Sequence, residues 1–157
     1  MNILIIEDDQ TKLKDLEAAV LSFPNAIIVG ECTSYSTGLR ALSSGGVDVV
    51  ILDMTIPLHD ETGSGGAGRK VQFGGELVLQ EMVAESMDAK VIVVSQHDYF
   101  ADLISEINLA QLGQRLQEKF GNKVVDTILY DSSEFIEGDA QGWRQHLKEA
   151  LLLCQTT

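Results

Sequence analysis

The chain has 157 residues, of which 45% are hydrophobic, and its formal net charge at pH 7 is −13. This length fits a single domain, residues 1–157, that is large enough to bury a sizeable core. The acidic balance argues against a sequence-independent grip on nucleic acid or on an anionic membrane, because both surfaces are negatively charged.

The sequence shows no sign of export or membrane insertion. The N-terminal residues lack the charged and apolar regions of a secretory leader, and the longest apolar runs are too short to span a bilayer. Cys32 and Cys154 have no motif spacing, so we expect two free thiols in a reducing compartment. These observations predict a cytoplasmic protein.

Strand and helix patterns alternate along the chain. Continuous apolar and β-branched runs predict buried strands over residues 2–6, 26–32, 47–53, 90–95 and 124–129. Apolar residues at helical spacing predict helices over residues 11–22, 36–42, 76–86, 100–120 and 141–154. This order predicts an α/β fold, a (βα)5 doubly wound five-stranded parallel sheet with helices on both faces and right-handed crossovers.

Two stretches break the simple alternation. Residues 59–75 form a glycine-rich insertion after the third strand, where such a loop usually has about 2–6 residues. Residues 100–120 give an extended fourth helix region that is longer than a crossover requires. Long segments beside a pocket are often functional.

Carboxylates follow two of the predicted strands. Glu7, Asp8 and Asp9 end the first strand, and Asp53 ends the third. The carboxyl ends of parallel strands meet at the edge where open α/β sheets bind ligands. Carboxylates gathered there repel one another unless a hard divalent cation, most simply Mg²⁺, is present. For Asp9 we also expect a role as the cap of the first helix.

These residues carry a family resemblance. Glu7-Asp8, Asp53 with Pro57 four residues later, and Ser95 after the fourth strand occur at strand ends in (βα)5 order. The set resembles the receiver domain of two-component response regulators, a flavodoxin-like, CheY-like fold, over essentially the whole chain.

The resemblance implies a role for each site residue. Asp53 corresponds to the aspartate that accepts a phosphoryl group from a histidine kinase. Asp8 corresponds to a carboxylate that binds Mg²⁺ directly, and Glu7 to its partner, which acts directly or through water. The backbone carbonyl of Thr55 corresponds to a further Mg²⁺ ligand, and the Ser95 hydroxyl to the group that bonds a phosphoryl oxygen.

The end of the fifth strand departs from the family pattern. The family has a lysine there, whereas this chain has Tyr130, which offers a hydroxyl but no charge at pH 7. Thr127 occupies the position of the family's aromatic switch residue. Residues 69–75 (Arg-Lys-Val-Gln-Phe-Gly-Gly) also resemble a divergent subset of receivers. Our hypothesis is that Arg69 or Lys70 supplies the missing charge; the alternative is a solvated loop tip.

The expected function is that of a stand-alone receiver that signals by protein–protein interaction. Its expected partners are a sensor histidine kinase or phosphotransfer protein and an unknown downstream protein. Its only expected chemistry is its own phosphorylation and dephosphorylation. The resemblance also points to pairing of two copies through helix 100–120, strand 124–129 and helix 141–154.

Two alternatives remain open from the residues. The first is a pseudo-receiver, a binding module that works without phosphorylation, for which Tyr130 is the best evidence. The second is a Mg²⁺-dependent aspartyl-phosphate phosphatase. It is disfavoured because Thr55 stands where such enzymes have a second aspartate.

Overall fold

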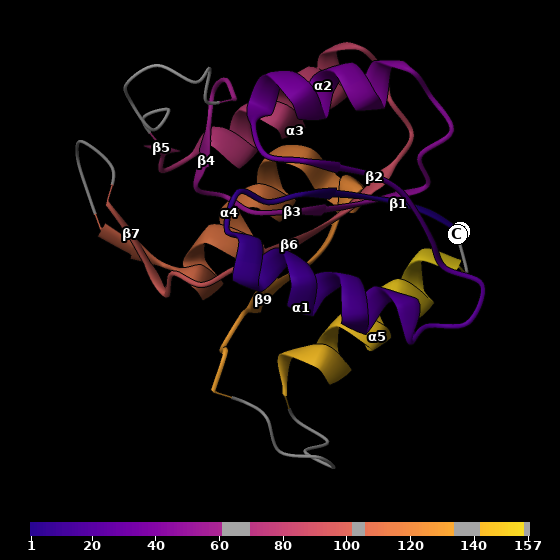
Figure 1. The fold of residues 1–157 in the computed structure, drawn as a ribbon. Helices are drawn as coiled ribbons and strands as arrows, with labels where there is room; N and C mark the ends of the chain where they lie inside the picture. The colour runs from indigo at the N-terminus through magenta and orange to yellow at the C-terminus, as the bar shows by residue number, and fades with distance from the viewer. Residues whose placement is uncertain (61–69, 102–105, 134–141, 156–157) are drawn as a thin grey trace.

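A central parallel sheet organises the molecule. The computed structural model describes residues 1–60, 70–101, 106–133 and 142–155. Five strands form the sheet in the order β2 (Ile27–Cys32), β1 (Asn2–Ile6), β3 (Val49–Leu52), β6 (Lys90–Ser95) and β9 (Val124–Leu129). Every neighbouring pair is parallel, which confirms the predicted topology (Figure 1).

Helices cover both faces of the sheet. Figure 1 shows α1 (Gln10–Leu21) and α5 (Trp143–Gln155) on one side and α2 (Tyr35–Ser43) and α3 (Gly74–Ala84) on the other. The core of the second side also includes residues of α4 (Leu109–Phe120), which is followed by a short 3₁₀ turn at Gly121–Lys123.

The period of the strands decides which core each residue joins. Ile3 and Ile5 pack with α1 and α5, whereas Leu4 and Ile6 pack with α2, α3 and α4. Because alternate side chains of a strand point to opposite faces and both faces are covered, residues 3–6 of β1 are all apolar. No helix in the described ranges has the length and apolar character needed to cross a bilayer.

The prediction of one continuous helix over residues 100–120 is wrong in its first part. Tyr99–Ala101 and Glu106–Asn108 form β7 and β8, an antiparallel pair. Phe100 is buried between two exposed neighbours, which is the alternation of a strand. The helix begins only at Leu109, because Asn108 caps it and exchanges hydrogen bonds with Gln111.

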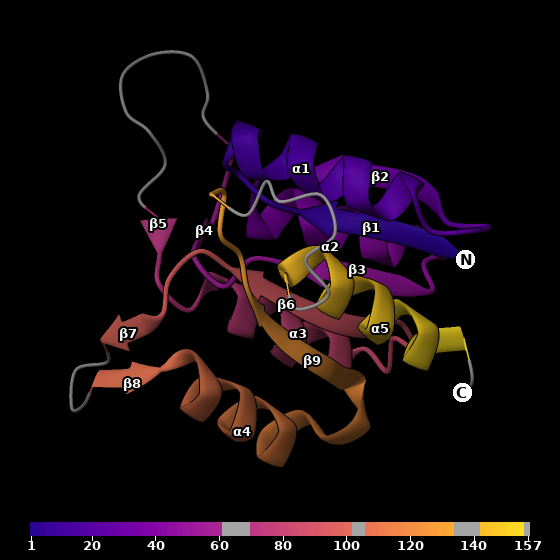
Figure 2. The ribbon, with the colours of Figure 1, turned by 90° about the horizontal axis from the view of Figure 1, so that it is seen from below.

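A second short antiparallel pair of strands joins the residues before the insertion to its later part. β4 (Ile56–Pro57) pairs antiparallel with β5 (Lys70–Val71), and residues 61–69 lie outside the described ranges. Figures 1 and 2 show this pair and the β7–β8 pair at the same end of the molecule. The rings of Phe73 and Phe100 pack with their centroids 5.9 Å apart, which joins the two irregular stretches.

The Phe-Gly-Gly motif has a steric explanation. A Cβ atom at Gly75 would lie 2.5 Å from the carbonyl oxygen of Asp53, and one at Gly74 would lie 2.6 Å from that of Ile56. Only glycine lets the first turn of α3 approach the backbone that follows β3 this closely. The motif therefore helps to place the turn that carries Asp53.

Candidate functional site

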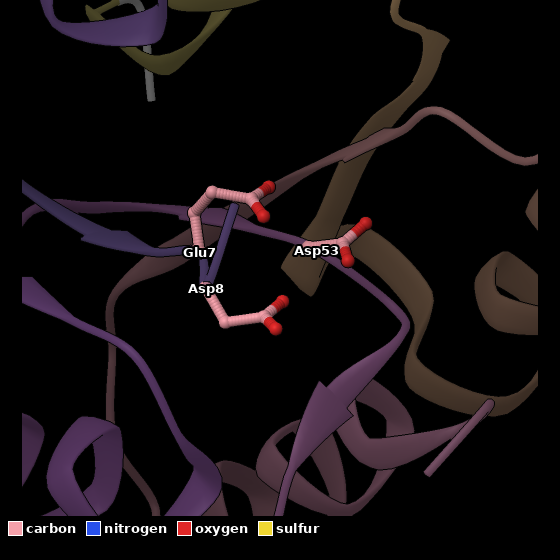
Figure 3. Close-up of side chains that lie close together, drawn as sticks. All are labelled: Glu7, Asp8 and Asp53. Atoms are coloured by element: carbon pink, nitrogen blue, oxygen red, sulfur yellow. The ribbon is translucent and has the colours of Figure 1, made fainter. Parts of the chain in front are cut away.

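Three carboxylates converge at the carboxyl edge of the sheet. Glu7 and Asp8 follow β1, and Asp53 follows the adjacent strand β3 (Figure 3). One oxygen from each carboxylate lies within 4.8 Å of the others. The backbone N–H of Asp53 donates to the Ile6 carbonyl at 3.0 Å, which continues the pairing of the strands to the site. The predicted meeting of these residues is thus present in the structure.

A buried lysine completes this cluster. The Lys12 side chain is only 1% exposed. Its Nζ donates to Asp53 Oδ1 at 2.9 Å and to the Val94 carbonyl at 2.6 Å, and it lies 2.6 Å from Glu7 Oε2. All three N–H donors of the ammonium therefore have an acceptor within reach.

Helix α1 holds this lysine in place from its first turn. The Asp9 carboxylate accepts hydrogen bonds from the backbone N–H groups of Thr11 and Lys12, both at 2.9 Å. This confirms the expected cap and fixes the start of the helix next to the site.

Sequence reasoning missed Lys12, although a signal was present. Lys12, Leu16 and Ala19 recur at the i, i+4, i+7 spacing of one helix face, and all three are buried. A charged residue that continues an apolar stripe is rarely buried without a partner. The acidic strand ends beside the start of α1 were candidates for that partner.

Tyr130 follows β9 as predicted, but its hydroxyl is hydrogen-bonded to Asp15 of α1. The hydroxyl donates to Asp15 Oδ2 at 2.7 Å, and the ring packs against Trp143 with the centroids 5.1 Å apart. Arg144 forms an ion pair with the same Asp15 carboxylate at 3.2 Å. Burial first, and the bond to Asp15 second, raise the pKa of Tyr130 well above its ordinary value, so it remains a neutral hydroxyl.

The remaining predicted site residues lie beside Asp53 or one strand away. The Thr55 N–H donates to Asp53 Oδ2 at 3.2 Å, which orients the carboxylate. Ser95 ends β6, the neighbour of β3, and its buried Oγ accepts from the His97 N–H at 3.1 Å. Arg69 lies outside the described ranges, and only the backbone of Lys70 is described, so the hypothesis about their charge stays a prediction.

The electrostatics of the cluster suit a divalent cation. Burial, followed by the charge of Asp53, raises the pKa of Glu7 to about 7, although Lys12 acts in the opposite direction. When all three carboxylates are ionised, the single ammonium leaves two negative charges unbalanced. Hard carboxylate oxygens are the ligands that Mg²⁺ prefers. Glu7, Asp8 and Asp53 therefore fit this ion in both chemistry and charge.

Thr127, at the position of the family's aromatic switch, packs closely against α4. A Cβ atom at Gly113 of α4 would overlap the Oγ1 of Thr127 on β9. The backbone of α4 thus lies directly on a small side chain, and a large ring at position 127 would collide with it.

Comparisons with known proteins agree with this fold. No family model matches the chain. It is 26% identical over 133 residues to the Detocs response regulatory protein DtcB of Enterobacter cloacae, covering 83% of this chain and 89% of that protein.

Solved structures show the same fold. The response regulatory domain of mrkE from Klebsiella pneumoniae superposes with a TM-score of 0.63 at 17% identity, over 99% of this chain and 96% of that one. The isolated REC domain of RcsB from Salmonella enterica serovar Typhimurium, solved with the phosphomimetic BeF₃⁻, gives 0.66 at 18% identity, over 99% and 88%. The chain therefore has the fold of response regulator receiver domains and is similar in sequence to a response regulatory protein.

Proposed function

We propose that this receiver domain accepts a phosphoryl group on Asp53 from a histidine kinase or a phosphotransfer protein, with Mg²⁺, and signals by binding another protein. The observation that carries the proposal is the cluster formed by Glu7, Asp8, Asp53 and Lys12. Asp53, only 4% exposed, ends a central strand beside two further carboxylates and a buried cation. Such a cluster is costly to assemble unless it binds a ligand.

The chemistry requires one nucleophile and stabilisation of charge. An Asp53 carboxylate oxygen attacks phosphorus while the phosphorus–nitrogen bond of the donor phosphohistidine breaks and its electron pair stays on the imidazole nitrogen. Thr55 and the Gly75 contact hold the carboxylate and its turn for this attack. Mg²⁺, held by Glu7, Asp8 and Asp53, would supply positive charge beside the phosphoryl oxygens.

The relatives support the partners in this proposal. A related protein carries the name response regulatory protein, and a receiver of the same fold was solved with a phosphomimetic. A cytoplasmic location agrees with Cys32 and Cys154, which are both free and half-buried. Pairing of two copies through α4, β9 and α5 belongs to the same proposal.

Intact mass spectrometry tests the proposal. The protein is incubated with acetyl phosphate and Mg²⁺, and we expect the mass of one phosphoryl group to be gained. Asp53→Asn should gain none, whereas Asp131→Asn, which changes an aspartate after the end of β9, should gain as much as the parent. A parent that stays unmodified with both acetyl phosphate and a phosphorylated histidine donor would contradict the proposal.

One observation favours the pseudo-receiver as a second candidate. Lys12 already forms an ion pair with Asp53, so the pocket is partly neutralised without a metal or phosphoryl group. Under this alternative, Asp53→Asn would bind the downstream partner as the parent does, and phosphoryl donors would change nothing.

A further inference from the structure

The geometry around Asp53 assigns a function to Lys12 that goes beyond the proposed function and rests on it. We propose that Lys12, carried by α1, binds the phosphoryl group on Asp53. It would thereby supply from a helix the positive charge that the neutral Tyr130 at the end of β9 does not supply.

Lys12 already touches the atom group that reacts. Its Nζ lies 2.9 Å from Asp53 Oδ1, so a phosphoryl group attached to this carboxylate comes within the reach of the ammonium. The hydrogen bond to Val94 and the ion pair with Glu7 keep Nζ beside Asp53 while its remaining donor changes partner. The Asp9 cap holds the backbone of the same residue.

Phosphoryl transfer gives this donor a better acceptor. Before transfer, one negative charge is shared by the two carboxylate oxygens of Asp53. After transfer, the Asp53 oxygens belong to a neutral acyl group, and about two negative charges lie on the phosphoryl oxygens. An ammonium bonds more strongly to such charged oxygens than to neutral ones, so Lys12 is expected to follow the charge.

Tyr130 is not placed for this task. Its hydroxyl is committed to Asp15, and its pKa is raised, so it donates one neutral hydrogen bond away from Asp53. Lys12 Nζ lies 5.9 Å from the centre of the Tyr130 ring. The Tyr130 ring therefore packs beside Lys12, and under this proposal Lys12 of α1 supplies the positive charge.

Binding of beryllofluoride, a mimic of an aspartyl phosphoryl group, tests this inference. The affinity for BeF₃⁻ at saturating Mg²⁺ is measured for the parent, Lys12→Met and Lys14→Met. We expect Lys12→Met to lose about 10- to 100-fold, the value of a charge-assisted hydrogen bond. Lys14 is an exposed lysine on the same helix, and its variant should match the parent within about twofold.

The affinity for Mg²⁺ alone separates phosphoryl binding from a merely structural counter-ion. Removal of the ammonium leaves the carboxylates more negative, so Lys12→Met should bind Mg²⁺ at least as tightly as the parent while it binds BeF₃⁻ more weakly. If a folded Lys12→Met binds BeF₃⁻ as well as the parent or better, the inference is overturned.

A measurement on the parent covers the case in which the variant does not fold. With ¹⁵N-labelled lysine, the Nζ resonance of Lys12 should shift when BeF₃⁻ is added to the Mg²⁺-loaded protein, and that of Lys14 should not. An unchanged Lys12 resonance in a protein that binds BeF₃⁻ overturns the inference and leaves the proposed function intact. A parent that binds neither BeF₃⁻ nor a phosphoryl group overturns both.

Discussion

The two faces of the sheet differ in how their helices pack near the carboxylate cluster of Glu7, Asp8 and Asp53. On the face of α1 and α5, Lys12 enters the pocket, and three residues later Asp15 bonds both Tyr130 and Arg144. On the face of α4, the backbone at Gly113 packs closely on Thr127. Arg115 and Lys119 of α4 form ion pairs with Glu76 of α3 on that face, whereas the polar contacts to Asp53 run through α1.

The proposed role of Lys12 would take the positive charge from the first turn of α1 and not from the strand end at Tyr130. Residues of α1 and the Tyr130 side chain belong to the same core, on one face of the sheet. Four predictions sharpen or break the comparison, from the largest expected effect to the smallest.

The largest effect is expected from Trp143→Ala, on the α5 side. Trp143 is 2% exposed and packs against Tyr130, so truncation should lower the free energy of unfolding by about 3–5 kcal/mol. Urea denaturation measures the change. Leu152→Ala, at a position that is 53% exposed on the same helix, should change it by less than about 0.5 kcal/mol. Equal losses would mean that the Trp143 contact does not hold α5.

On the α4 face, Thr127→Phe should lower the free energy of unfolding by about 1–3 kcal/mol, because the ring would meet the backbone of α4 at Gly113. Thermal unfolding measures the loss. The matched control is Leu129→Phe, at a position that is 44% exposed on the same strand. A stable Thr127→Phe protein would show that this face has room for an aromatic switch.

Tyr130→Phe should have a smaller effect on stability and almost none on phosphorylation. It removes the bond to Asp15, at a cost of about 1 kcal/mol, while the Arg144 ion pair remains. The rate of phosphorylation by acetyl phosphate should stay within about twofold of the parent. A tenfold loss of this rate in a folded protein would show that Tyr130 takes part in the phosphorylation of Asp53.

The smallest effect concerns the thiols, one in contact with each core. Burial raises the pKa of Cys154, in α5, to about 11, and it also raises the pKa of Cys32 on the other face. Because the thiolate is the reactive form, Cys154 should react with iodoacetamide at pH 8 about 100-fold more slowly than an unperturbed thiol. Peptide mapping over time gives the rates. Fast labelling of Cys154 would indicate that the end of α5 opens.

Much of the fold followed from local patterns. The five strands and the helix that starts after Asp9 were predicted within a few residues, because burial on both faces demands continuous apolar runs. Residues 99–108 were mistaken for helix. There, the seven-residue spacing of Phe100 and Ile107 fits a helix, but in the structure the two residues are cross-strand partners of a hairpin. Phe100 packs on Phe73, from a distant part of the chain.

The site divides in the same way. The acidic strand ends were fixed by the order of the chain alone, because parallel strands with short turns bring Glu7, Asp8 and Asp53 to one edge whatever surrounds them. Which residue places a positive charge beside these carboxylates was decided only by the tertiary structure. The long, flexible side chain of Lys12 could point to solvent or inward, and the uncompensated carboxylates drew it in. The position of Tyr130 was also decided by the tertiary structure, because its hydroxyl donates a hydrogen bond to Asp15 of α1.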